Sequence, residues 1–347
     1  MTESGSAPGP TSKRRSRGEL LLLLLGLTIA AVGLELVCRL IETHAPPKLG
    51  YAPVRGHRSR EPQNAAGYRD TEHARVKPAS VHRAVFLGDS FTYGVGVLLD
   101  DTYPKRVERA LSASRAETWE SLVFAVPGID SEQEEQIFEN EALAYSPDVV
   151  VLGYVLNDAE DENAAEIRRA AEWTEHEREK ANPAWWRKSA FLSLVGDRLH
   201  ATRENHDRIA NHLALYQSNA PGFLSVRKSI ARMASLCQDR HIPFVVLVFP
   251  LFANPLNDSY PFKSIHEKVD ALCRSLGAHV VDLLPSYRDL DWHLLVVEGE
   301  HDEHPNEVAH RIAAQGLVAE LSSILRPRAQ PSKVGSYQPL AAGRADS

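Results

Sequence analysis

The stretch RAVFLGDSFTYG, residues 83–94, joins a short apolar run to a polar turn. Four more short runs rich in β-branched and apolar residues follow, and helical patterns lie between them. This alternation is typical of a parallel sheet covered by helices. The continuous run at residues 149–152 suits a strand buried on both faces. We therefore predict a three-layer α/β/α sandwich with a mostly parallel five-stranded sheet.

The predicted strands and helices fall in strict alternation except in one place. We expect strands at residues 83–87, 121–126, 148–154, 243–249 and 279–283. We expect helices near residues 101–113, 131–145, 225–240, 261–276 and 306–325. Residues 159–224 are too many for a simple loop between a strand and a helix, so we predict an insertion with helices of its own.

Charge and cysteine content exclude several classes of protein. The net charge of −7 divides into +3 on the first 18 residues and −10 on the rest, and an acidic body argues against a nucleic-acid partner. The three cysteines, Cys38, Cys237 and Cys273, are too few and too scattered for a zinc cluster, and we expect no metal. Cys237 and Cys273 are either one disulfide or two buried thiols, and we favour the thiols.

The N-terminal region resembles a membrane anchor. Residues 20–34 carry no charge, and a helix from Leu20 to Cys38 spans about 28 Å, enough to cross a bilayer core. The basic residues before it favour a cytoplasmic N-terminus, which places the rest in the periplasm. A cleaved signal peptide ending at Thr43-His44-Ala45 is the alternative, and we prefer the uncleaved anchor.

These patterns divide the chain into five parts. They are a basic cytoplasmic head (1–18), a transmembrane anchor (19–41), a linker and lead-in segment (42–81), the α/β domain with the insertion 159–224 (82–326) and a disordered tail (327–347).

The residues that follow the predicted strands include a set suited to acyl transfer. Ligands of open parallel sheets gather beyond the carboxyl ends of the strands. Ser90, Gly128 and Asn157 follow the first three strands, and Asp302 and His304 precede the last helix. A serine becomes a nucleophile only when a base accepts its proton and donors stabilise the oxyanion. Each residue alone fits a turn or a helix cap, but together they supply every part.

This ordered set resembles the SGNH/GDSL hydrolase superfamily, with its flavodoxin-like fold, over roughly residues 64–325. The resemblance implies that Ser90 is the nucleophile, that His304 is the base and that Asp302 orients the base. It also implies an oxyanion hole made by the Ser90 and Gly128 amides and the Asn157 side chain, and no cofactor. Many relatives have the acid three residues before the histidine, where this chain has His301, so Asp302 departs from the pattern.

Two polar stretches have less certain roles. Residues 64–70, NAAGYRD, resemble a lead-in found in membrane-anchored bacterial members, and we expect Tyr68 to pack while Arg69 and Asp70 make a surface contact. The acidic run from Asp158 to Glu162 is expected to be a solvated helix start instead of a cation site.

The function predicted from these features is that of a membrane-anchored serine esterase acting on an acylated small molecule or an envelope glycan. Two alternatives remain open. One is an O-acyltransferase that uses the same residues, and the other is a non-catalytic carbohydrate-binding or scaffold protein. In the insertion, basic residues surround Trp185, Trp186, Phe191 and Leu192. This stretch either rests on a membrane or caps the site, or its aromatic residues pack on the core, and we favour the packing.

Overall fold

The computed structural model describes residues 17–44, 63–115, 117–160, 174, 177–178, 185–297 and 303–325. The predicted tail lies outside the described residues, as do most of the basic head, much of the expected linker and part of the insertion. The chain divides into two compact units, one of residues 1–50 and 160–217 and the other of residues 51–159 and 218–347.

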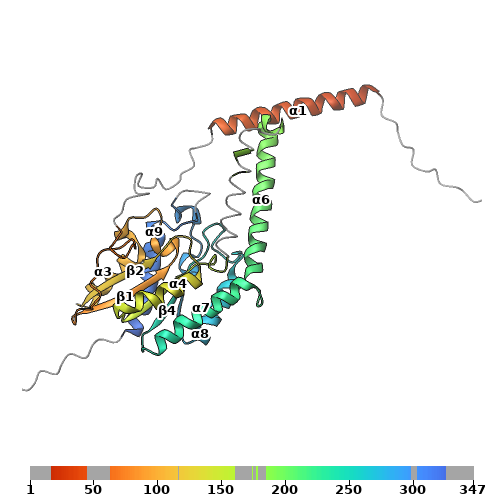
Figure 1. Ribbon diagram of the computed structural model, residues 1–347. Helices are drawn as coiled ribbons and strands as arrows, with labels where there is room; N and C mark the ends of the chain where they lie inside the picture. The colour runs from red at the N-terminus through yellow and green to blue at the C-terminus, as the bar shows by residue number, and fades with distance from the viewer. Residues whose placement is uncertain are drawn as a thin grey trace, which may run out of the picture. The chain divides into compact units, whose positions relative to one another are not determined.

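The second unit is built on a five-stranded sheet in which every pair of neighbouring strands is parallel. The strands are β1 (Val81–Gly88), β2 (Thr118–Ala125), β3 (Val149–Tyr154), β4 (Phe244–Val248) and β5 (His279–Asp282). Their order is β2-β1-β3-β4-β5, so β1 lies between two strands that follow it in sequence. Each predicted strand is present, and the predicted parallel sheet flanked by helices is confirmed (Figure 1).

The helices of this unit form the two outer layers. They are α3 (Tyr103–Arg115), α4 (Ser131–Asn140), α7 (Pro221–Gln238), α8 (Lys263–Ser275) and α9 (Glu307–Ile324). Helix α3 packs on α9, and α4 packs on α7. Right-handed crossovers between parallel strands place α3 on one face of the sheet and α4, α7 and α8 on the other. Helix α9 follows the last strand and lies on the same face as α3, on which it packs. Short helices join them: α2 (Ser90–Tyr93), η1 (Leu99–Asp101), η2 (Ala142–Tyr145), η4 (Leu284–Tyr287) and η5 (Trp292–Leu294).

The core lies on both faces of the central strands. Val150, Val151 and Leu152 of β3 are fully buried, as the continuous apolar run predicts. Burying one such side chain stabilises the fold by about 1.5–3 kcal/mol, so β1, β3 and β4 form a rigid support for the loops at their carboxyl ends.

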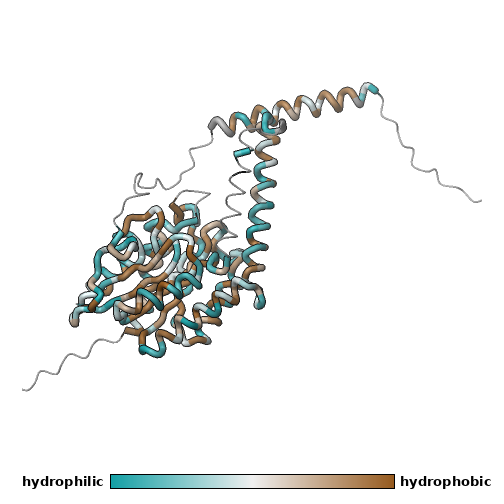
Figure 2. The backbone as a smooth tube through the Cα atoms, viewed as in Figure 1, coloured by the Kyte–Doolittle hydropathy of each residue, from teal (hydrophilic) through white to brown (hydrophobic). Residues whose placement is uncertain are grey.

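The first unit contains α1 (Arg17–His44), η3 (Trp185–Lys188) and α6 (Ala190–Leu215). Residues 17–41 of α1 are long and apolar enough to cross a membrane, a test that a signal sequence also passes. Figure 2 shows the mostly hydrophobic α1 and the hydrophilic middle of α6. At the start of α6, Phe191 is half-buried and Leu192 is 40% exposed, and the packing of the aromatic residues of the insertion stays a prediction.

Polar contacts join the end of α1 to the start of α6. The Glu35 carboxylate accepts hydrogen bonds from Ser189 Oγ (2.8 Å), the Ala190 amide (2.9 Å) and the Phe191 amide (3.1 Å). Arg39 donates to the Lys188 carbonyl oxygen at 3.0 Å. The first amides of a helix have no partner within it, and here a side chain of α1 provides one.

All three cysteines are buried and free. Cys237 lies on α7 and Cys273 on α8, and burial raises the pKa of each thiol to about 12. The interpretation of these residues as two buried thiols is therefore confirmed.

Candidate active site

The strand register brings three of the predicted site residues to one edge of the sheet. Gly88, the last residue of β1, is paired with a residue of β2 on one side and of β3 on the other. Ser90, Gly128 and Asn157 follow these three strands within a few residues. Because the strands are parallel, all three residues lie beyond the same carboxyl-terminal edge, as the sequence predicts.

The turn that carries Ser90 lies unusually close to the strands below it. A Cβ atom on Gly88 would lie 2.0 Å from Thr92 Oγ1, and one on Gly153 would lie 2.2 Å from the same atom. The Thr92 hydroxyl is hydrogen-bonded to the Tyr103 hydroxyl at 2.9 Å. Only glycine leaves room for this pair of hydroxyls, so the two glycines allow the turn that carries Ser90 to pack closely on the ends of β1 and β3.

Asp89 joins the serine turn to Asn157. Its carboxylate accepts hydrogen bonds from the Phe91 amide (2.9 Å), Asn157 Nδ2 (3.3 Å) and Ser90 Oγ (3.4 Å). Asp89 is fully buried, and burial raises its pKa although the bonds from Phe91 and Asn157 act in the opposite direction. The sequence alone predicts no site role for Asp89, because an aspartate before a helix is an ordinary N-cap.

His304 lies in the loop before α9, and its backbone is held on both sides. Its carbonyl oxygen accepts a hydrogen bond from the Val297 amide at 3.0 Å. Asn306 caps α9 through bonds from two backbone amides. The His304 ring lies 5.8 Å from the Phe91 ring, measured between centroids, which places it beside the residue after Ser90. Asp302, predicted as its acidic partner, lies outside the described residues.

A second histidine lies nearby but has a different environment. His310 is fully buried, its Nδ1 accepts a hydrogen bond from the Tyr103 amide at 3.1 Å, and burial lowers its pKa to about 3. It is therefore a neutral side chain that supports α3 at physiological pH. His304, by contrast, is only half-buried.

Two further carboxyl groups are buried near this edge. Glu134 and Asp158 are 1% and 4% exposed, so the prediction that Asp158 belongs to a solvated helix start is wrong. Burial raises the pKa of both groups well above the ordinary value. The charge of Asp158 adds to the shift of Glu134, and the charge of Asp89 adds to the shift of Asp158. Both Glu134 carboxyl oxygens, Asp158 Oδ1 and Asn157 Oδ1 are buried without a hydrogen-bond partner among the described residues. No group of three or more potential ligands in the described part of the chain is arranged to hold a metal ion.

The lead-in segment, residues 64–70, belongs to the second unit and is partly buried within it. Arg69 and Asp70 are 5% and 3% exposed, so the expected surface contact is wrong. Asp70 pairs with Lys105 Nζ at 2.5 Å and accepts a hydrogen bond from the Val123 amide at 2.9 Å. Burial raises the pKa of Asp70, but the bond from His73 and the charge of Lys105 outweigh it and lower the pKa.

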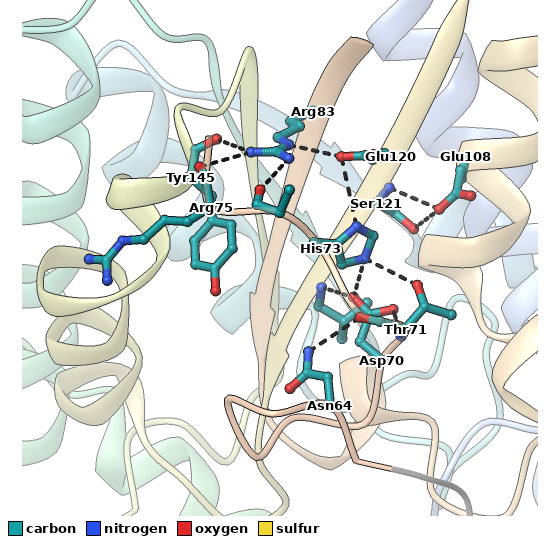
Figure 3. A network of polar contacts seen from close by, with 12 residues as sticks. Asn64, Asp70, Thr71, His73, Arg75, Arg83, Glu108, Glu120, Ser121 and Tyr145 are labelled. Carbon is teal, nitrogen blue, oxygen red and sulfur yellow. Dashed lines mark hydrogen bonds and ion pairs between the residues drawn. The ribbon is translucent and has the colours of Figure 1, made fainter. Parts of the chain in front are cut away.

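Figure 3 shows the polar network between this segment and the start of β1. Arg83 is fully buried and donates to Glu120 Oε2 (2.9 Å) and to the carbonyl oxygens of Tyr145 (2.9 Å) and Ala74 (2.6 Å). A cavity of about 170 Å³ is lined by the lead-in segment, β2 and Tyr145. The cavity is smaller than the roughly 300 Å³ of small ligand pockets, and none of the predicted site residues lines it.

Comparison with known proteins agrees with the resemblance seen in the sequence. Similar solved structures include a lipolytic protein of the G-D-S-L family from Desulfitobacterium hafniense DCB-2, with 12% identity over 68% of this chain and 98% of the other, and a TM-score of 0.40. The lipase/acylhydrolase from Enterococcus faecalis has 14% identity over 72% and 100%, with a TM-score of 0.43. No curated protein matches the chain. Residues 86–312 match the model of the GDSL-like lipase/acylhydrolase family, to which this chain, an ester-bond hydrolase, therefore belongs.

Proposed function

We propose that the chain is a membrane-anchored serine esterase in which Ser90 is the nucleophile and His304 the general base. Ser90 Oγ attacks the ester carbonyl carbon while His304 takes the hydroxyl proton, and the alcohol leaves with that proton. Water then attacks the acyl-enzyme, with His304 again as the base, which releases the carboxylic acid and restores Ser90. By the family resemblance, Asp302 would hold the second ring nitrogen of His304.

The single observation that carries this proposal is the bonding of both Ser90 and Asn157 to the buried Asp89 carboxylate. One N–H of the Asn157 amide is used by Asp89, and the other remains to donate to an oxyanion. The Ser90 and Gly128 amides would complete the oxyanion hole. Gly128 has a positive φ of 85°, which suits a tight turn after β2.

The anchoring part of the proposal is supported by the contacts of Glu35. A cleaved signal peptide leaves the mature protein, and α6 would then lose the carboxylate that caps its first amides. A retained helix keeps this cap, so we infer an uncleaved anchor with the N-terminus in the cytoplasm and the catalytic domain in the periplasm. The proposed glycan substrate follows from this location alone.

Anchoring is tested by expressing the full chain with one epitope tag at each end. If the helix is retained, we expect a single membrane-bound product that carries both tags. In a second chain, the C-terminal tag is replaced by an enzyme that is active only outside the cytoplasm, and we expect this reporter to be active. A smaller product that has lost the N-terminal tag would contradict the proposal. An inactive C-terminal reporter would contradict the periplasmic location and, with it, the proposed envelope glycan substrate.

Catalysis is tested with the full chain in lipid nanodiscs and aryl esters of short and long acyl chains. We expect hydrolysis that disappears in Ser90→Ala and in His304→Ala. Ser229→Ala is the matched control, because this buried serine lies on α7 and has no predicted role. Hydrolysis equal in all four proteins would contradict the esterase mechanism. Release of product that depends on an added sugar hydroxyl would favour the acyltransferase alternative.

A further inference from the structure

Arg69 binds the backbone of the turn that follows the proposed nucleophile. Its guanidinium donates to the carbonyl oxygens of Tyr93 (2.6 Å), Gly94 (3.0 Å) and Val97. The group also lies 5.2 Å from the centre of the Tyr93 ring. Arg69 is 5% exposed, and a buried charge of this kind stabilises a structure only when its donors are satisfied. We call residues 93–97 the clamped turn.

The clamped turn is bonded directly to Ser90. The Ser90 carbonyl oxygen accepts hydrogen bonds from the Gly94 amide at 3.0 Å and the Val95 amide at 3.2 Å. Gly94 ends α2 in the left-handed conformation with a φ of 76°. Arg69 therefore binds the carbonyl groups of the clamped turn, and the amides of the same turn bind the carbonyl oxygen of Ser90.

The neighbouring residue, Asp70, fixes the backbone from which Arg69 extends. Its carboxylate bonds to the Val123 amide of β2, a strand of the sheet, and pairs with Lys105 of α3, a helix that packs on that strand. Asn64 Oδ1 accepts from the Tyr68 amide at 3.0 Å and closes the turn before Arg69. The guanidinium is thus presented from a fixed position, and its planar fork meets several carbonyl groups at once, which an ammonium does not.

We propose that Arg69 is a positioning residue that sets the orientation of Ser90 through the clamped turn. This inference rests on the proposed role of Ser90 as the nucleophile. Arg69 then acts on Ser90 through the backbone, although it precedes the serine motif in the chain and contacts no reacting atom.

The test compares Arg69→Ala and Arg69→Lys with wild type in the aryl ester assay. Misplacement of a catalytic group by about 1 Å costs about 100-fold in rate, so we expect kcat to fall about 10- to 100-fold in Arg69→Ala with KM within about twofold. We expect only partial recovery in Arg69→Lys, because a point charge does not span the same acceptors. Added guanidinium chloride, below the denaturing range, is expected to restore part of kcat in Arg69→Ala and to leave Arg69→Lys unchanged.

Arg83→Ala is the matched control, because Arg83 is also buried and also donates to backbone carbonyl groups, but at the other end of β1. We expect this variant to lose thermal stability while it keeps the wild-type kcat below its unfolding temperature. An equal loss of kcat in Arg69→Ala and Arg83→Ala would reduce the role of Arg69 to general stability and overturn the proposal.

Hydrogen exchange of the clamped turn separates this inference from the esterase proposal. In Arg69→Ala we expect faster exchange at the Gly94 and Val95 amides and unchanged exchange in β4. Unchanged exchange at those two amides, or faster exchange with unchanged kcat, would overturn the role of Arg69. If wild type shows no Ser90-dependent hydrolysis, the proposed function fails, and with it the catalytic role of Arg69, while the exchange result still decides whether Arg69 holds the turn. If Arg69→Ala does not fold, Arg69→Lys is measured in the same way.

Discussion

Two sets of buried polar residues, one between the lead-in segment and the start of β1 and the other near the carboxyl-terminal edge of the sheet, differ in how they are paired. In the lead-in network, Asp70 and Arg83 are buried and each has several hydrogen-bond partners. At the sheet edge, Glu134 has no partner for either carboxyl oxygen among the described residues, although it is equally buried. Burial therefore does not distinguish Glu134 from Asp70 and Arg83, but hydrogen-bond satisfaction does.

This difference indicates different roles for the two sets. A paired buried charge rigidifies its surroundings, whereas an unpaired buried group costs stability and marks a place where selection for function opposes selection for stability. The pKa values agree, because the pKa of Asp70 is lowered while those of Asp89 and Glu134 are raised, chiefly by burial. We infer that the lead-in network stabilises the fold and that the edge is shaped by catalysis, and four experiments test this comparison.

The largest effect is expected at the edge itself. In Ser90→Ala, kcat should fall by at least about 10⁴-fold because no acyl-enzyme forms, while the melting temperature changes little. The measurement is ester hydrolysis after removal of trace contaminants, with calorimetry on the same samples. A large fall in the melting temperature of this variant would contradict the division of roles, because the edge would then also stabilise the fold.

The second effect concerns stability and lies in the lead-in network. Asp70→Asn leaves Lys105 without its closest charged partner, and breaking a buried ion pair costs about 3–5 kcal/mol. The free energy of unfolding is measured in urea. Asp258→Asn, which breaks the exposed pair with Arg288, is the control and should cost far less.

The pH dependence of Asp70→Asn provides a second reading. Because the pKa of Asp70 is lower in the folded than in the unfolded state, its charge stabilises the fold above about pH 4. This contribution is lost as the pH falls through the folded-state pKa, so wild type and variant should converge in acid. A constant difference at all pH values would mean that the contribution of Asp70 is not ionic.

The third effect tests one proposed donor of the oxyanion hole. Asn157→Ala should lower kcat by about 10²- to 10³-fold, as the loss of one donor does in other acyl-transfer enzymes. Asn205→Ala, on α6, is the control and should keep full activity. Equal activity of Asn157→Ala and wild type would remove Asn157 from the oxyanion hole.

The smallest effect is a gain of stability. Because the pKa of Glu134 is raised in the folded state, the unfolded chain loses this proton first as the pH rises above about 4.5, and stability declines. Glu134→Gln removes that loss, so we expect the variant to be more stable by about 1 kcal/mol at pH 8 and unchanged at pH 4. Glu132→Gln, exposed on the same helix, should show no such gain. If Glu134→Gln were less stable than wild type at pH 8, the Glu134 carboxylate would have a partner, and the two sets would not differ in pairing.

The sheet could be predicted from the sequence because its strands are continuous apolar runs. Each of the five begins and ends within a few residues of its predicted bounds, and their carboxyl ends place Ser90, Gly128 and Asn157 at one edge. The position of each residue a few places after its strand is enough to predict this shared edge, because parallel strands have their carboxyl ends on the same side.

The burial of charged residues could not be predicted in the same way. Arg69, Asp70, Glu134 and Asp158 are polar, and polarity alone indicates exposure. Their environments are created by residues far along the chain, such as Lys105 for Asp70, and no periodic pattern records such pairs. The role of Asp302 stays a prediction.

The two buried thiols can report the unfolding of the second unit. Cys237 and Cys273 lie on α7 and α8, and a thiol with a pKa of about 12 is almost entirely protonated at neutral pH and does not react with alkylating agents. Each becomes reactive only when its helix leaves the sheet. Pulses of iodoacetamide therefore record how often this helical layer opens, without any engineered label, and mass spectrometry of the two peptides tells whether both helices open together.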